Sequence, residues 1–120
     1  MYKLMVVDDS NIIRSQIQNN LNDMQFELVA MASTGDEAVR LFKQFHPEVV
    51  TMDITMPGMD GLECIQNLIE IDPEVRILVV SALSDKATGI KALEYGAQGF
   101  VCKPFTNEQL MEALIELIQD

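Results

Sequence analysis

The chain alternates short apolar runs with segments that carry apolar residues at helical spacing. The runs are rich in Val, Ile and Leu and cover residues 4–7, 26–32, 48–52, 75–80 and 99–102. Near-continuous apolar runs of this length are typical of strands in a parallel sheet covered on both faces. They predict five strands.

The segments between the runs have the period of amphipathic helices. Ile13 and Ile17, for example, lie four residues apart on one predicted helix face. Segment 85–95 has the weakest pattern, because Thr88 and Gly89 lower its helix propensity. Alternation of strands and helices predicts an α/β fold, a doubly wound five-stranded parallel sheet with five helices, in a single domain of residues 1–120.

Capping residues stand where several predicted helices begin. Ser10 or Asn11 is suited to cap the first helix, and Asp60 the third. Thr106 followed by Gln109 matches a capping box for the last helix. These signals agree with the boundaries that the apolar runs predict.

Polar residues occupy the positions where four of the apolar runs end. Asp8 and Asp9 follow the first run, Asp53 the third, Ser81 the fourth and Lys103 the fifth. In a parallel sheet all carboxyl ends lie at one edge, and in open α/β sheets ligands bind there. Three carboxylates, a hydroxyl and an ammonium are therefore expected at one edge.

This set of groups suits a phosphoryl-transfer site with a metal ion. Carboxylates at 4 Å repel by about 4 kcal/mol per pair at an effective dielectric constant of 20, so a cation is expected among them. Oxygen ligands favour Mg²⁺ or Mn²⁺. A cation, Lys103 and a hydroxyl around Asp53 would make that carboxylate a nucleophile for a phosphoryl group. Taken singly, each residue also fits a helix cap, a turn or a surface position.

Composition restricts the partners. The 120 residues include 19 acidic and 8 basic side chains, a net charge of −11, which argues against nucleic acid and against anionic membranes. No apolar run approaches the roughly 18 residues of a membrane span, and the N-terminus does not resemble a signal peptide. Cys64 and Cys102 form no CxxC pair. We expect a cytoplasmic protein with reduced thiols.

Four motifs resemble those of response-regulator receiver domains of two-component systems. They are VVDDS at 6–10, TMDITMPGMDG at 51–61, VSA at 80–82 and FVCKPF at 100–105. DDS followed by Arg14 looks most like the stand-alone chemotaxis-type regulators. The resemblance implies the flavodoxin-like strand order 2-1-3-4-5.

The resemblance also implies roles for the acidic residues. Asp53 is the expected phosphorylation site. Asp9 is the expected direct ligand of Mg²⁺ (or Mn²⁺), with Asp53 and the main-chain carbonyl of Thr55, and Asp8 acts mainly through water. Lys103 is expected to pair with the phosphoryl oxygens, next to a cis bond to the following proline.

Four positions are implied to change state or to control water. Ser81 is expected to hydrogen-bond to the phosphoryl group, and Phe100 to be the aromatic switch that follows it inward. Thr55 and Leu83 are expected to gate the hydrolytic water. Ser81 and Phe100 stand where Thr and Tyr are more frequent in the family.

The implied function is phosphorelay signal transduction. A histidine kinase is the expected phosphodonor. The expected output protein binds the face made by the fourth helix, fifth strand and fifth helix, where Glu108, Glu112 and Glu116 form an acidic stripe. A phosphatase is a further expected partner. The chain is expected to catalyse only its own phosphorylation and dephosphorylation and not to be an enzyme otherwise.

Other interpretations stay open at this point. The chain is also compatible with a receiver domain cut from a longer response regulator, or with a receiver-like scaffold. A haloacid-dehalogenase-like phosphatase would place its nucleophile after the first strand, whereas Asp53 follows the third run. A flavodoxin would need a loop rich in Ser, Thr and Gly after the first strand, where this chain has two aspartates.

Overall fold

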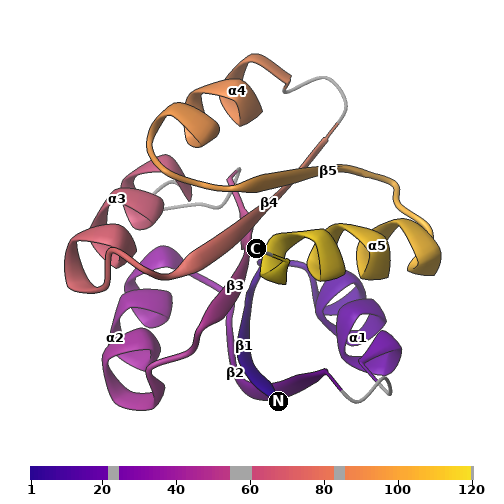
Figure 1. Ribbon diagram of the computed structural model, residues 1–120, viewed down its shortest axis with the longest axis horizontal. Helices are drawn as coiled ribbons and strands as arrows, with labels where there is room; N and C mark the ends of the chain where they lie inside the picture. The colour runs from indigo at the N-terminus through magenta and orange to yellow at the C-terminus, as the bar shows by residue number, and fades with distance from the viewer. Residues whose placement is uncertain (22–24, 55–60, 83–85, 120) are drawn as a thin grey trace.

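The computed structural model describes residues 1–21, 25–54, 61–82 and 86–119. Within these ranges five strands and five helices alternate, as the apolar runs predict (Figure 1). The strands are β1 (Tyr2–Val7), β2 (Phe26–Ala32), β3 (Val49–Asp53), β4 (Arg76–Ala82) and β5 (Gly99–Lys103). The helices are α1 (Asn11–Asn20), α2 (Gly35–Phe45), α3 (Gly61–Ile71), α4 (Lys86–Glu94) and α5 (Asn107–Ile118).

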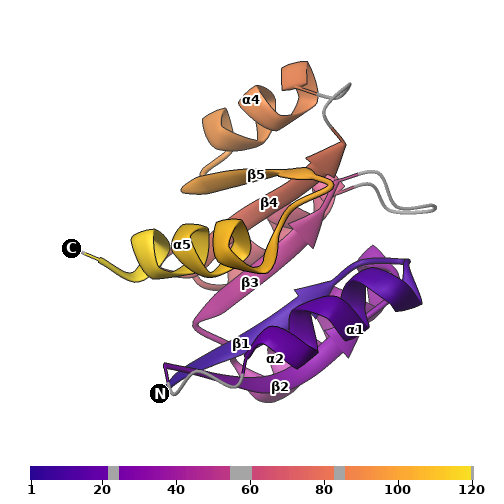
Figure 2. The ribbon, with the colours of Figure 1, turned by 90° about the vertical axis from the view of Figure 1, so that its right-hand side faces the viewer.

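The strands form one parallel sheet in the order β2-β1-β3-β4-β5, which confirms the predicted flavodoxin-like topology. Helices α1 and α5 cover one face, and α2, α3 and α4 cover the other (Figure 1). The strand arrowheads point toward the same edge of the sheet (Figure 2). That edge carries the residues predicted to form the site. Among the described helices, none has the length and apolar character that a membrane crossing requires.

Coverage on both faces explains why the strands are apolar without interruption. In β1, Leu4 and Val6 belong to the core beneath α1 and α5, whereas Met5 and Val7 belong to the core beneath α2 and α3. All four are at most 1% exposed. Because neighbouring strand residues point to opposite faces, each face needs its own apolar set.

Strand β1 begins two residues earlier than the apolar run predicts. Tyr2 pairs with Phe26 in the register of β1 and β2, and the Tyr2 N–H donates to the carbonyl of Gln25 at 2.8 Å. The exposed Lys3 interrupts the apolar pattern there. The predicted β2 boundaries, 26–32, are confirmed.

Two predicted helix starts are confirmed in detail. Ser10 is the N-cap of α1, and its Oγ accepts from the N–H of Ile13 at 3.3 Å. Thr106 and Gln109 form the capping box of α5, with bonds of 3.1 Å and 2.8 Å between side chains and main-chain N–H groups. Asp60, predicted to cap α3, lies outside the described residues.

Candidate functional site

Three carboxylates meet at the carboxyl edge of the sheet, where β1 and β3 end side by side. Asp8 directly follows β1, and Asp53 is the last residue of β3. Asp8 is 1% exposed and Asp53 2% exposed, whereas Asp9 is exposed. One carboxylate oxygen from each of the three residues lies within 4.8 Å of the other two. The structure therefore brings together the acidic residues that the sequence placed at this edge.

Lys103 brings a positive charge to the same place from the end of β5. Its Nζ lies 3.0 Å from Asp8 Oδ2 and 3.6 Å from Asp53 Oδ2. Strands β3 and β4 separate β5 from β1, so the lysine side chain reaches across their ends. The bond from Lys103 to Pro104 is cis, as the family resemblance implied.

Burial makes the negative charge on Asp8 costly. Removal from water is the main cause that raises the pKa of Asp8 above its ordinary value, and the nearby charge of Asp53 adds to the increase. The N–H of Ser10 donates to Asp8 Oδ1 at 2.9 Å and, together with Lys103, acts in the opposite direction. The single charge of Lys103 does not by itself balance three carboxylates, so the cluster favours a further positive charge.

The donor set fits a hard divalent cation. Asp8 Oδ2 is buried and, apart from the ammonium of Lys103, has no hydrogen-bond partner among the described residues. Carboxylate oxygens gathered around one point, with a side open to water at Asp9, are the ligands that Mg²⁺ prefers. Asp8, Asp9 and Asp53 therefore could hold Mg²⁺ or Mn²⁺.

Ser81 completes the predicted set from β4. It is fully buried, and it is the next residue after Val80, which pairs with Asp53 in the sheet. Its hydroxyl donates to the carbonyl of Ala82 at 3.1 Å. Because a hydroxyl has a single proton, Ser81 donates no hydrogen bond to Asp53 in this conformation.

The sequence profile of the response regulator receiver domain matches residues 4–115. This chain belongs to that family. Asp53 ends the third strand in sequence order, so the dehalogenase-like phosphatase does not describe this protein. Asp8 and Asp9 follow β1 where a flavodoxin would need a phosphate-binding loop, so the flavodoxin does not describe it either.

Relatives of this receiver domain include chemotaxis regulators. Chemotaxis protein CheY of Listeria monocytogenes is 40% identical over 114 residues, which cover 95% of this chain and 96% of that protein. Chemotaxis protein CheY of Bacillus subtilis is 38% identical over 113 residues, which cover 94% of each chain. A solved CheX–CheY–BeF3–Mg²⁺ complex from Borrelia burgdorferi matches with a TM-score of 0.92 at 30% identity, covering 99% of this chain and 90% of that one. The resemblance to chemotaxis-type regulators is confirmed.

Phe100 lies on the same face of the receiver sheet as Ser81. It pairs with Val79, two residues before Ser81, and alternate strand residues point to one face. The ring is half-buried and lies against Gly89 of α4, where a Cβ atom would be 1.8 Å from a ring carbon. The sequence marks Gly89 only as a weak point in a helix. The structure shows that the glycine provides the space for the ring, a contact that helix periodicity does not signal.

Two of the residues predicted to belong to the site lie outside the described part of the chain. They are Thr55, implied both to supply a metal ligand and to gate water, and Leu83, implied to gate water. Their roles stay predictions.

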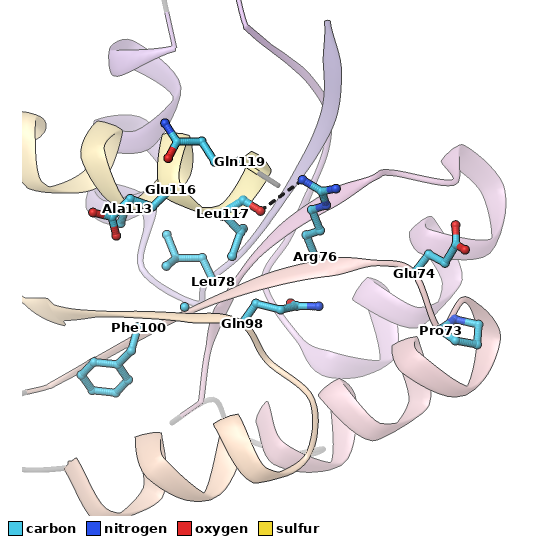
Figure 3. A pocket seen from close by; sticks show the side chains of 11 residues that line it. Pro73, Glu74, Arg76, Leu78, Gln98, Phe100, Ala113, Glu116, Leu117 and Gln119 are labelled. Atoms are coloured by element: carbon cyan, nitrogen blue, oxygen red, sulfur yellow. Dashed lines mark hydrogen bonds between the residues drawn. The ribbon is translucent and has the colours of Figure 1, made fainter.

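A cavity of about 520 Å³ lies at the opposite edge of the sheet, near the amino ends of β4 and β5 (Figure 3). Two of its polar side chains, Arg76 and Gln98, already have partners. Arg76 donates to the carbonyl of Leu117 at 3.2 Å (Figure 3). The side-chain amide of Gln98 accepts from the N–H of Ile77 at 2.8 Å and donates to the carbonyl of Val75 at 3.2 Å. These groups join α5 and β5 to β4, so this cavity is not the candidate site.

Proposed function

We propose that residues 1–120 act as one receiver domain that accepts a phosphoryl group on Asp53 from a histidine kinase and then binds an output protein of a chemotaxis-type system. The observation that carries this proposal is the surroundings of Asp53. Its carboxylate is 2% exposed, belongs to a cluster suited to a divalent cation and lies 3.6 Å from Lys103 Nζ. Phosphoryl transfer depends mainly on such positioning and charge neutralisation.

In the transfer step, an oxygen of the Asp53 carboxylate forms a bond to phosphorus. The bond from phosphorus to the imidazole nitrogen of the donor breaks, and its electron pair stays on that nitrogen. Lys103 pairs with a phosphoryl oxygen. The domain thus promotes its own phosphorylation, and by admitting water it promotes its own dephosphorylation, but it acts on no separate substrate.

A divalent cation, Mg²⁺ or Mn²⁺, supplies the second positive charge near the phosphoryl oxygens when it is bound. Asp9 and Asp53 are its proposed direct carboxylate ligands. Asp8, whose Oδ2 lies 3.0 Å from Lys103 Nζ, is proposed to act through water. The main-chain carbonyl of Thr55 is the remaining proposed protein ligand.

Phosphorylation then changes the position of Ser81. Its hydroxyl leaves the carbonyl of Ala82, to which it donates in the present conformation, and donates to a phosphoryl oxygen. The ring of Phe100, on the same face of the sheet, follows inward. Since Phe100 has no hydroxyl, burial alone favours its inward position.

The proposed output surface consists of α4, β5 and α5. Ile90 is 60% exposed and Leu93 41% exposed on α4, and Glu108, Glu112 and Glu116 are exposed on α5. Apolar side chains beside an acidic stripe suit a partner with apolar and basic groups. One CheY relative forms a complex with CheX, and we extend to this chain the capacity to bind a separate output protein or phosphatase. A cytoplasmic location stays a prediction.

Acetyl phosphate with Mg²⁺, followed by intact-mass measurement, tests the proposal. The wild-type protein should gain one phosphoryl group, and Asp53→Asn should gain none. The matched control is Asp36→Asn, because Asp36 is exposed on α2 and does not belong to the carboxylate cluster. A phosphoryl group gained by folded Asp53→Asn on another native side chain would refute the assignment of the acceptor.

A further inference from the structure

The side chain of Arg14 connects the first turn of α1 to the end of β1. Its Nη1 donates to the main-chain carbonyl oxygen of Asp8 at 2.5 Å, and its Nη2 donates to Asn11 Oδ1. We propose that Arg14 is a positioning residue for the cation site, because it fixes the peptide unit between Asp8 and Asp9. This inference rests on the proposed function, since it concerns the proposed ligands.

Asp8 is held through three of its groups, the main-chain N–H, the carboxylate and the main-chain carbonyl. Its N–H donates to the carbonyl of Ala32 at 3.0 Å, and its carboxylate accepts from the N–H of Ser10 at 2.9 Å. Its carbonyl oxygen accepts a hydrogen bond from the guanidinium of Arg14. The first two bonds hold the nitrogen and the side chain, so Arg14 is the contact that holds the carbonyl side of the residue.

The effect reaches Asp9 through the rigid peptide plane. The carbonyl oxygen of Asp8 belongs to the same planar unit as the nitrogen of Asp9, so fixing that oxygen fixes the direction in which the Asp9 main chain leaves β1. Asp9 is exposed and its carboxylate has no hydrogen bond among the described residues. Its orientation toward Asp53 therefore depends on the main chain that Arg14 holds.

Positioning and simple charge predict opposite effects of removing Arg14. The guanidinium is positive, so by Coulomb's law alone its loss would strengthen the binding of a nearby cation. If Arg14 orients the ligand-bearing peptide, its loss weakens that binding. The sign of the change in Mg²⁺ affinity therefore distinguishes a positioning role of Arg14 from a purely electrostatic one.

The test is an NMR titration of the full chain with Mg²⁺, followed on the amides around Asp9. Arg14→Met should weaken Mg²⁺ binding about tenfold, the lower end of the effects seen when residues behind metal ligands are removed. Arg14→Lys keeps the charge but not the planar fork, so a smaller loss of about threefold is expected. Arg40→Met is the control for charge: Arg40 is exposed on α2 and its nearest acidic partner is Glu37. It should leave the affinity unchanged.

Saturating Mg²⁺ gives a second readout. It should restore phosphorylation of Arg14→Met by acetyl phosphate to the wild-type rate, because positioning affects occupancy of the cation site. If Arg14→Met does not fold, Asn11→Ala replaces it, since it removes only the second partner of the guanidinium and should weaken Mg²⁺ binding by a smaller factor. The inference is overturned if folded Arg14→Met binds Mg²⁺ as tightly as wild type. It is also overturned if this variant is still phosphorylated more slowly than wild type at saturating Mg²⁺. Failure of the wild-type protein itself to bind Mg²⁺ would instead refute the proposed function.

Discussion

Polar groups at the two ends of the sheet differ in how far the protein itself pairs them. At the amino end, the side-chain oxygen of Gln98 accepts from the N–H of Ile77 in β4, and its nitrogen donates to the carbonyl of Val75 just before β4. Arg76 donates to Leu117, and its guanidinium lies 5.9 Å from the ring centre of Tyr2. At the carboxyl end, three carboxylates gather, and the ammonium of Lys103 pairs with two of them, Asp8 and Asp53.

This difference distinguishes polar groups that stabilise the fold from polar groups that are available to a ligand. A polar group that is fully paired by the protein contributes to stability and has no remaining capacity for a ligand. Buried carboxylates without enough positive charge cost stability, and natural proteins keep such conflicts mainly at functional sites. Polar residues at the two ends of a sheet are therefore not equally good candidates for a ligand-binding site. The better candidates are those whose charge the protein does not balance.

Lys103→Met should have the largest effect, because it leaves two buried carboxylates without their counter-charge. The free energy of unfolding in metal-free buffer should fall by about 3 kcal/mol, the lower end for a broken buried ion pair. Urea denaturation with and without Mg²⁺ measures this, and Mg²⁺ should restore part of the loss. The same variant should accept some phosphoryl group without the NMR shift changes that follow in wild type.

Lys43→Met on α2 is the control for Lys103→Met, because Lys43 is exposed. An equal loss in both variants, or no loss in Lys103→Met, would show that the ammonium is not what balances Asp8 and Asp53.

Gln98→Ala tests the amino end and should come second in size. It leaves the N–H of Ile77 and the carbonyl of Val75 without their side-chain partner, which should lower the free energy of unfolding by about 2 kcal/mol. Mg²⁺ affinity and phosphorylation should not change, because these groups serve only the fold. Gln44→Ala, at an exposed position on α2, should be neutral for stability. A change in Mg²⁺ affinity in Gln98→Ala would contradict the separation of the two ends.

Asp8→Asn should stabilise the metal-free protein while weakening Mg²⁺ binding. Burial raises the pKa of Asp8 above its ordinary value of 3.8, so the folded state binds this proton more tightly than the unfolded state. The stability contributed by this group therefore rises as pH falls through the raised pKa, and at neutral pH the ionised form is a penalty. Removing the charge should therefore raise the free energy of unfolding at neutral pH.

Urea denaturation of Asp8→Asn and wild type at neutral and mildly acidic pH measures the change in the free energy of unfolding and its pH dependence. The advantage over wild type should shrink as the pH is lowered, because wild-type Asp8 becomes protonated. Asp36→Asn, at an exposed position, is the control. An advantage that grows toward acidic pH would mean that burial is not the dominant cause.

The sequence predicts this fold and most of this site because both depend on local patterns. The apolar runs fix which segments are strands, and the position of Asp53 at the end of one run places its carboxylate at the binding edge. Single contacts between distant residues leave no such pattern. Gln98 pairing with β4, Arg14 holding the carbonyl of Asp8 and Gly89 accommodating a ring all depend on three-dimensional approach that periodicity does not encode.

The contact between Gly89 and Phe100 should give the smallest net change, and it connects the site face to the proposed output surface. Gly89→Ala should gain about 1 kcal/mol of helix propensity. The new Cβ would lie 1.8 Å from a carbon of the Phe100 ring, so the ring must move and most of this gain is lost. In a Phe100→Ala background the space is free and the full gain should return. A double-mutant cycle should therefore show a coupling of about 1 kcal/mol between the two positions.

Thr88→Ala is the matched control for this cycle, because it raises helix propensity in the same helix and should act equally in both backgrounds. NMR signals of the Phe100 ring should shift in Gly89→Ala and not in Thr88→Ala. Additive effects of Gly89→Ala and Phe100→Ala would show that the ring does not depend on the glycine. A measured coupling means that the position of Phe100 and the position of α4 are not independent, so a movement of the ring toward Ser81 would change the surface on which Ile90 and Leu93 are exposed.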